Sequence, residues 1–174
     1  EIKAQAVAIV GDHVWIAGGD PGAEPEQGMD GEEIPARPGG AGFVIHSADR
    51  GSTWETLVSG HPWCFRDIDF IDADLGFAAG GNGVAASGVL ARTGDGGATW
   101  DDAPPPALPD SEILMPKQSA KEAASCLAVD FYGADVGLAL CSTAALGMSG
   151  FNALFRTTDG GDSWELRPGF REGF

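Results

Sequence analysis

Basic residues are scarce in this chain. It has 10 Lys and Arg against 26 Asp and Glu in 174 residues, which gives a net charge of −16. Nucleic-acid binding requires Lys and Arg to neutralise phosphates, so this balance argues against it, and it also disfavours an anionic membrane surface. A basic partner or divalent cations remain compatible with the charge, and so does a role in solubility alone.

Long apolar runs are also missing, and no segment is apolar over enough residues to span a bilayer. We therefore expect no membrane insertion. No signal-peptide pattern is seen, because Glu1 leads directly into strand-like sequence. Such an opening suits either a processed mature protein or an excised segment.

Cysteine is rare, with three residues, no CxxC pair and no Cys/His cluster of zinc-binding spacing. Cys126 and Cys141 flank a predicted hairpin, so they can face each other across it. Two interpretations stay open. A disulfide would imply an oxidising compartment, and hence a secreted or periplasmic protein. The alternative is a pair of buried free thiols.

Helix-type apolar periodicity is scarce, whereas glycine is plentiful, with 27 residues. Many Gly-rich turns between short apolar runs predict an all-β chain. No Gly-rich run leads from a strand into a helix, so these glycines indicate turns rather than a phosphate-binding loop.

A turn motif with the pattern Ser/Thr-x-Asp-x-Gly-x-Thr/Ser-Trp occurs three times without gaps. Its main positions are Ser47, Asp49, Gly51 and Trp54, then Thr93, Asp95, Gly97 and Trp100, then Thr157, Asp159, Gly161 and Trp164. Each copy lies between short strand-like runs, which predicts the turn of a hairpin. The Asp can accept hydrogen bonds from backbone N–H groups of its own turn, and the Gly supplies a backbone angle that is costly for other residues. The Trp enters the next strand, where we expect its ring to be buried between sheets.

A second element recurs upstream of the motif, because residues 67–80 match residues 128–141 and residues 6–18 form a shorter version. Each copy is typical of two strands joined by a turn with Asp and Gly. One unit is therefore four short strands with the motif between the third and the fourth. The three units run over residues 1–60, 61–106 and 120–170, and the 46-residue step from Trp54 to Trp100 suits one propeller blade.

These residues resemble the BNR/Asp-box repeat family, which includes sialidases, xyloglucan-cleaving glycosidases, sortilin-type receptors and photosystem II stability/assembly factor-like proteins. The stretch from Gly76 to Gly83, leading into residues 90–100, is most similar to the assembly-factor branch. The resemblance implies β-propeller blades with Asp-box turns. Propellers close with about four to eight blades, so three motifs predict an incomplete propeller, or one completed by another protein or a second copy of the chain. The acidic charge departs from the basic patch expected of the photosynthetic assembly factors.

The connections between blade strands place the variable material. In such a blade the Asp-box turns lie on one face of the disc, and the connections from second to third strand and from blade to blade lie on the other. Three insertions, residues 19–41, 101–123 and 142–152, fall on these connections and are predicted to converge on the face opposite the Asp-boxes. Long loops in compact domains are often functional, although decorative loops are the alternative.

Acidic and aromatic residues near these insertions are the candidate binding groups. The acidic ones are Asp20, Glu24, Glu26, Asp30, Glu32 and Glu33. Of these, Asp20, Asp30 and Glu32 are candidate calcium ligands, although the loop lacks the Asp/Asn ladder of calcium motifs and a solvated loop is the alternative. Trp63 lies outside the repeat and is the predicted ligand-contacting aromatic, with local packing as its alternative.

No catalytic set stands out. A sialidase-like site would need an arginine cluster and a tyrosine nucleophile, but the single Tyr132 is expected at a turn on the wrong face. We therefore predict a non-enzymatic, extracytoplasmic propeller module without a cofactor, which binds or scaffolds proteins through the loop face. The alternative is part of a carbohydrate-active propeller, either a glycoside hydrolase or a glycan-binding module.

Overall fold

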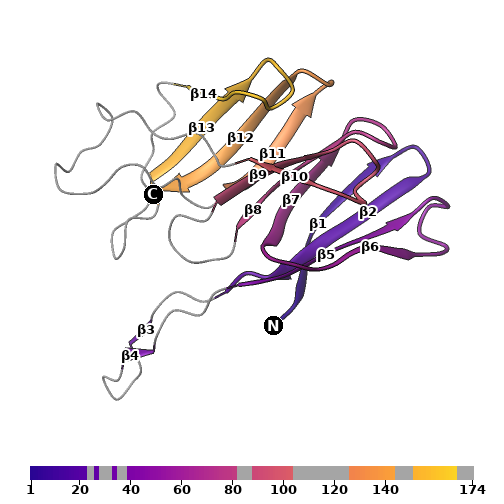
Figure 1. Ribbon diagram of the computed structural model, residues 1–174, viewed down its shortest axis with the longest axis horizontal. Helices are drawn as coiled ribbons and strands as arrows, with labels where there is room; N and C mark the ends of the chain where they lie inside the picture. Colours follow the sequence, from indigo (N-terminus) through magenta and orange to yellow (C-terminus); the bar gives the residue numbers. More distant parts are fainter. Residues whose placement is uncertain are drawn as a thin grey trace.

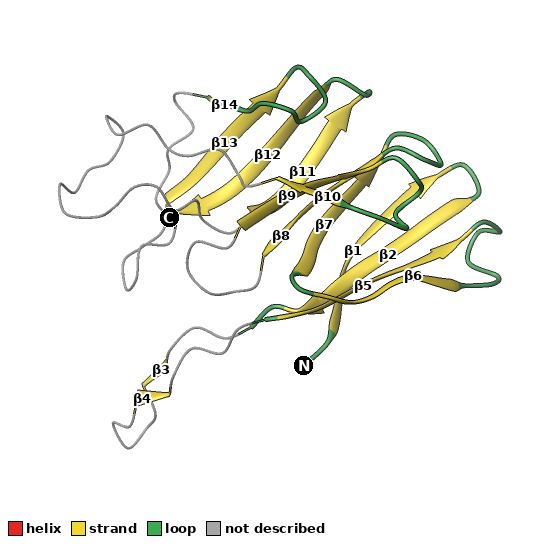
Figure 2. Ribbon diagram, viewed as in Figure 1, coloured by secondary structure: helices red, strands yellow, loops and turns green. Residues whose placement is uncertain are grey.

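The computed structural model describes residues 1–22, 26–27, 33–34, 39–81, 88–103, 126–143 and 151–167. These residues form strands, turns and bends (Figure 2). No helix that could cross a membrane occurs among them.

Three four-stranded antiparallel sheets follow one another along the chain and stand side by side (Figure 1). Their strands are β1 (Lys3–Val10), β2 (His13–Asp20), β5 (Gly40–Ser47) and β6 (Glu55–His61), then β7 (Cys64–Phe70), β8 (Gly76–Gly81), β9 (Gly88–Thr93) and β10 (Asp101–Ala103), then β11 (Cys126–Tyr132), β12 (Val136–Thr143), β13 (Phe151–Thr157) and β14 (Glu165–Leu166). Within each sheet the strands pair in chain order. The predicted all-β class with three four-stranded units is therefore confirmed, and we call the sheets blades one, two and three.

The strands extend into the predicted insertions. β2 ends at Asp20 and β5 begins at Gly40, and a small hairpin of β3 (Glu26–Gln27) and β4 (Glu33–Ile34) lies between them. β10 takes the first three residues of the insertion predicted over 101–123. Hydrogen bonding to the neighbouring strand therefore continues further than the loop-like composition indicates.

A bulge lies at the same place in the first strand of each blade and sets a common register. It falls between Ala4 and Ala6, between Phe65 and Asp67, and between Cys126 and Ala128, with 61 residues from one to the next. Residues 61 apart in these strands are therefore equivalent. Val7, Ile68 and Val129 all lie opposite the same position of the second strand, and so do Ile9, Phe70 and Phe131.

The hydrophobic core lies at the two seams between blades. The first cluster joins Trp15, Ala17 and Val44 of blade one to Ile68, Phe70 and Ala78 of blade two, and the second joins Phe77, Ala79 and Leu90 of blade two to Val129, Phe131 and Phe155 of blade three. Successive side chains of a strand point to opposite faces. β8 therefore contributes to both seams, and all six of its residues are buried.

The Asp-box tryptophans do not share one environment. Trp100 and Trp164 pack against the first and second core cluster, but Trp54 is 42% exposed. The prediction that all three rings are buried is thus wrong for Trp54. The ring packs toward the preceding blade, and among the described residues none precedes blade one.

Candidate functional site

The three Asp-box turns (residues 47–54, 93–100 and 157–164) contain the same hydrogen-bond network. In the second turn the Thr93 hydroxyl donates to Asp95 Oδ1 at 2.8 Å and accepts the Gly97 N–H at 2.9 Å. Asp95 also accepts the N–H of Thr99 at 2.9 Å and its hydroxyl at 2.6 Å. Gly97 has a φ of 95°, which is costly for residues with a Cβ.

Hydrogen bonding also explains the acidity of these turns. The backbone N–H and hydroxyl of Thr53 lower the pKa of Asp49 to about 2, and the hydroxyl and N–H of Ser163 do the same for Asp159. Thr99 likewise lowers the pKa of Asp95. The charged carboxylates are thus engaged within their own turns, which indicates a structural role.

The other predicted residues lie in varied surroundings. A disulfide joins Cys126 and Cys141, which face each other across β11 and β12. Trp63 is only 4% exposed, packs on His61 and Phe65, and donates its indole N–H to Asp102 Oδ2 at 2.8 Å. This burial does not fit the predicted ligand contact of Trp63, and the packing alternative describes its environment. The reason is tertiary, because the ring joins the core of the first seam.

The acidic loop is described only at its edges. Asp20 accepts the amino terminus at 3.2 Å and the Gly22 N–H at 3.0 Å. The predicted binding residues Glu24, Asp30 and Glu32 lie outside the described residues, and of Glu26 and Glu33 only the backbone is described. In the described ranges no group of three His, Cys, Asp or Glu is arranged to hold a metal ion. The calcium site therefore stays a prediction.

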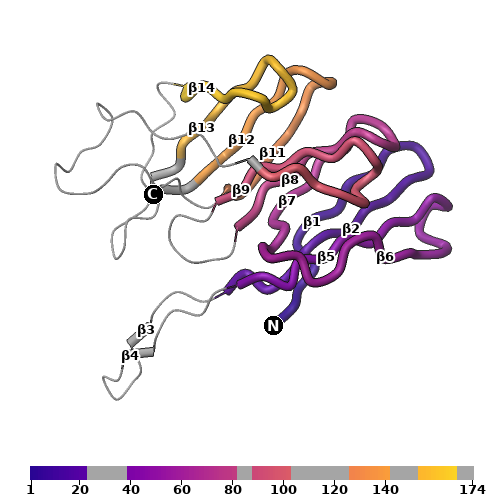
Figure 3. Tube along the Cα trace, viewed as in Figure 1, coloured from indigo at the N-terminus to yellow at the C-terminus, as the bar shows by residue number. Residues whose placement is uncertain are grey.

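The ends of the strands divide the arc into two sides. All three Asp-box turns lie at one end of the blades, and β2, β8 and β12 end, while β5, β9 and β13 begin, at the other (Figure 3). β10 and β11, which flank residues 104–125, also meet this second end. The described strand ends thus agree with connections that leave from one side, which we call the loop side.

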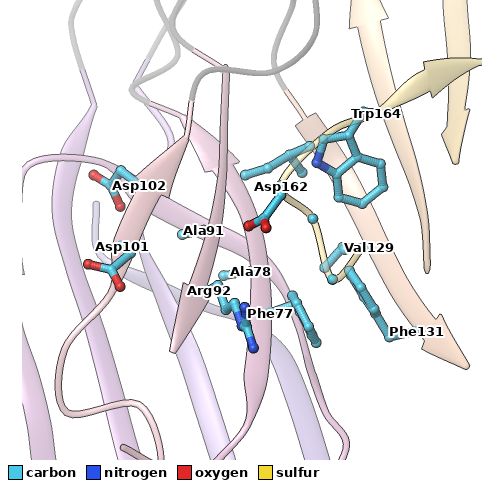
Figure 4. A pocket seen from close by; sticks show the side chains of 13 residues that line it. Phe77, Ala78, Ala91, Arg92, Asp101, Asp102, Val129, Phe131, Asp162 and Trp164 are labelled. Carbon is cyan, nitrogen blue, oxygen red and sulfur yellow. The ribbon is translucent and has the colours of Figure 1, made fainter. Parts of the chain in front are cut away.

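A groove of about 420 Å³ lies at the second seam, between blades two and three (Figure 4). Its apolar walls are Phe77, Leu90, Val129, Phe131 and Trp164, and its charged residues are Arg92, Asp101, Asp102 and Asp162. Asp101 and Asp102 stand on one side of it, and Phe131 and Trp164 on the other (Figure 4). The volume is within the usual range of ligand pockets, about 300–1,000 Å³.

The groove forms where Phe77 takes the place that Trp15 has in blade one. Trp15 is fully buried, stacks on Phe70 with ring centroids 3.9 Å apart, and donates its indole N–H to the Gly96 carbonyl at 2.8 Å. Phe77 stacks on Phe131 in the same way, at 3.4 Å, but has no N–H to reach across the seam. The smaller ring leaves the second seam more open than the first.

The residue beside this ring also differs between the seams. His46 packs on Trp15 at 5.0 Å, whereas its equivalent Arg92 extends past Phe77, 6.0 Å from the ring centroid, and stays exposed. The groove therefore has a cation near its aromatic wall and three carboxylates around it. Sequence reasoning missed this site, and only an alignment of the second strands, Trp15 with Phe77, carries a signal for it.

Two carboxylates of β7 tie blade two to blade three. Asp67 accepts the Val129 N–H at 3.0 Å and Asp69 accepts the Phe131 N–H at 2.8 Å. Burial raises the pKa of both groups, and these hydrogen bonds oppose the rise. The alternating Asp residues of β7 are thus part of the seam, a role that the sequence analysis did not assign.

A polar cluster also forms at the first seam. His13 and His46 ring nitrogens lie 2.9 Å apart, His46 hydrogen-bonds Glu55 at 3.0 Å, and both imidazoles stack near Trp15. In the part of the chain described here, no hydroxyl or thiol is hydrogen-bonded to this row of side chains. The arrangement thus resembles packing around Trp15 more than a nucleophile with its base.

Comparison with known proteins supports the fold. No family model and no curated protein matches the chain. Among solved structures it is similar to YCF48 bound to a D1 peptide, with 18% identity, a TM-score of 0.56, and coverage of 95% of this chain and 40% of that one. It is also similar to YCF48 from Cyanidioschyzon merolae, with 20% identity, a TM-score of 0.52, and coverage of 95% and 37%. The resemblance to photosystem II assembly-factor propellers is thus confirmed at the level of fold, and the chain is a three-bladed arc that spans about 40% of such a propeller.

Proposed function

We propose that this chain is a non-enzymatic protein-binding module, which recognises a peptide segment of another protein. The observation that carries the proposal is the likeness over 95% of the chain to a propeller, YCF48, whose structure contains a bound D1 peptide. Both the fold and the way in which propellers present loops on a rigid scaffold suit such a role.

The loop side is the first candidate surface. Strands from all three blades end there, so the connections that follow them start close together on a rigid base. A peptide that contacts several connections at once would be held by a large surface without a deep pocket. Residues 23–38 and 104–125 are the longest such connections, and their acidic members favour a partner segment with Lys or Arg.

The groove at the second seam is the second candidate surface, and its geometry favours one kind of side chain. Apolar walls of Phe77, Phe131 and Trp164 would take an aliphatic or aromatic side chain. Asp101 and Asp162 would pair with a neighbouring basic side chain of the same peptide. The predicted ligand is therefore an extended segment in which a Lys or Arg is close to an apolar residue.

A peptide array tests the proposal and separates the two surfaces. The probes are the D1 peptide and a panel of 15-residue peptides with and without a Lys or Arg beside an apolar residue, measured by fluorescence anisotropy. Deletion of 23–38 or of 104–122 should weaken binding about tenfold or more if the loop side holds the peptide. Phe77→Trp should do so if the groove holds it, because the chain itself shows at Trp15 that a Trp closes a seam.

The outcomes are distinguishable. Absence of binding to every peptide by the folded protein would refute the proposed function. A parallel glycan array and hydrolysis assay covers the carbohydrate-active alternative, which would be favoured by glycan binding without peptide binding. Unchanged circular dichroism of each variant shows that lost binding is not lost folding.

We also propose an extracytoplasmic location, and what supports it is the Cys126–Cys141 disulfide, because disulfides persist in oxidising compartments. Thiol trapping in cells tests it. Rapid acid quenching and alkylation of the native protein should label Cys64 alone after unfolding, whereas labelling of all three cysteines would count against this location.

A further inference from the structure

The two end faces of the arc carry the same residue pattern as the two seams inside it. Every seam joins the tail face of one blade, the side that faces the next blade, to the head face of the following blade. In blades two and three the head face consists of two residues of the first strand and the Asp-box Trp: Ile68, Phe70 and Trp100, and Val129, Phe131 and Trp164. The four first-strand residues are only 3–7% exposed.

Blade one has the same head face without a cover. The equivalent residues Val7 and Ile9 are 61% and 68% exposed, and Trp54 is 42% exposed. All three are large and apolar at positions that the chain buries elsewhere. A contiguous exposed apolar surface of this kind is a typical interaction site.

The tail face of blade three is open in the same way. Leu138 lies where blade one has Trp15 and blade two has Phe77, but its exposure is 42% against 0% and 2% for those two. Tyr132 is 91% exposed, whereas its equivalents Val10 and Ile71 pack against the seams.

The polar groups of the two end faces are complementary as well. Asp69 of blade two accepts the Phe131 N–H of blade three. On the tail face of blade three the equivalent of Asp69 is the exposed Asp130, and on the head face of blade one the equivalent of Phe131 is Ile9. A tail face that meets a head face therefore gives Asp130 the backbone N–H of Ile9 as a donor.

We propose that these end faces are two halves of one blade-to-blade interface, and that the chain uses them to bind a second copy of itself head to tail. The two internal seams are the template for the contact. Head-to-head pairing would set Trp54 against Trp54 and leave Asp130 without its donor, so the heterologous arrangement fits better. Two head-to-tail contacts between two copies would make six blades, which is within the range of closed propellers.

Charge gives this association a testable salt dependence. Each copy has a net charge of −16, so two copies repel each other at low ionic strength. The contact itself is mainly apolar. Added salt screens the repulsion, and we expect it to strengthen the association rather than weaken it.

Sedimentation equilibrium with three variants tests the proposal. Ile9→Asp changes the head face, Leu138→Asp changes the tail face, and Ala98→Asp is the matched control, because Ala98 is an exposed Asp-box residue whose equivalent in blade three is already Asp162. The wild-type chain should form a species of twice its 17.9 kDa mass. Each end-face variant alone should weaken this association about tenfold or more, since it buries a charge in an apolar contact, whereas the control should not.

Mixing provides the decisive outcome. An equimolar mixture of Ile9→Asp and Leu138→Asp should recover a two-chain species, because one partner supplies an intact tail and the other an intact head. The proposal is overturned by a wild-type chain that stays monomeric at about 1 mM, by end-face variants that associate like the control, or by a mixture that associates no better than its components. Val7→Asp and Tyr132→Asp repeat the test if either first variant has an altered circular dichroism spectrum.

The proposed peptide binding and this self-association can fail separately. The inference rests on the same three-bladed arc as the proposed function but uses neither the loop side nor the groove. Ile9→Asp and Leu138→Asp leave both of those surfaces unchanged, so a peptide that binds the wild-type chain should also bind the two variants.

Discussion

Replacement of Trp15 by Phe tests how the first seam is closed. Trp15 is fully buried, and it combines a ring stack on Phe70 with an indole hydrogen bond to the Gly96 carbonyl at 2.8 Å. Phe keeps most of the stack. It loses the hydrogen bond and part of the buried ring, and it makes the first seam resemble the second, where Phe77 already lines a groove.

The expected cost follows from these two losses. Loss of the hydrogen bond with a buried carbonyl left behind costs about 1 kcal/mol. The missing part of the ring adds about 1–2 kcal/mol of lost burial and cavity formation. Trp15→Phe should therefore lower the free energy of unfolding by about 2–3 kcal/mol, which for a chain of this size is a fall of about 5–10 °C in Tm.

Urea unfolding followed by circular dichroism measures the effect without relying on tryptophan fluorescence. Trp54→Phe is the matched control, because Trp54 also donates its indole N–H to a glycine carbonyl, Gly51 at 3.0 Å, but is 42% exposed. At low protein concentration it should lose less than about 1 kcal/mol. The reasoning would be refuted by equal losses in the two variants, or by a loss below about 1 kcal/mol for Trp15→Phe.

Three further predictions concern the turns, the disulfide and pH. Thr93→Val should cost about 2 kcal/mol, because it leaves the buried Gly97 N–H without its acceptor. Thr93→Ser should cost much less, since Ser47 makes the same bonds in the first turn, and equal losses in an unfolding assay would contradict the network. Reduction of the Cys126–Cys141 disulfide, which closes 15 residues, should remove up to about 3 kcal/mol, and an unchanged melting temperature in reductant would contradict this. The lowered pKa values of Asp49 and Asp159, about 2 against 3.8, predict stability that is present above pH 3.8 and is lost as the pH falls toward 2. The raised pKa values of Asp67 and Asp69 predict the opposite, stability that is present below pH 3.8 and is lost as the pH rises through their folded values. Melting temperatures measured from pH 2 to pH 7 should therefore change less below pH 4 in Asp49→Asn/Asp159→Asn and less above pH 4 in Asp67→Asn/Asp69→Asn, and curves parallel to the wild type would contradict both signs.

The Asp-box turns show how much a local motif can predict. Thr93, Asp95 and Gly97 make their bonds within five residues of chain. Their role therefore depends on short-range chemistry that a sequence pattern records. The fold class follows from three such turns and the strand-like runs around them.

Trp54 and Trp63 show where such reasoning stops. Trp54 matches Trp100 and Trp164 in every local respect, yet its exposure depends on whether a blade lies before it. Trp63 lacks a repeat partner, and its burial depends on Phe65, His61 and a carboxylate 39 residues away. Neither environment can be read from neighbours in sequence.

The sequence by itself determined the repeat, the hairpin turns and the all-β class of this protein, because each depends on residues close together in the chain. Only the tertiary structure decided which surfaces the blades leave open. The groove beside Phe77 and the uncovered faces at Ile9 and Leu138 depend on how strands about 60 residues apart pack side by side, with one residue of size or one missing neighbour deciding the result.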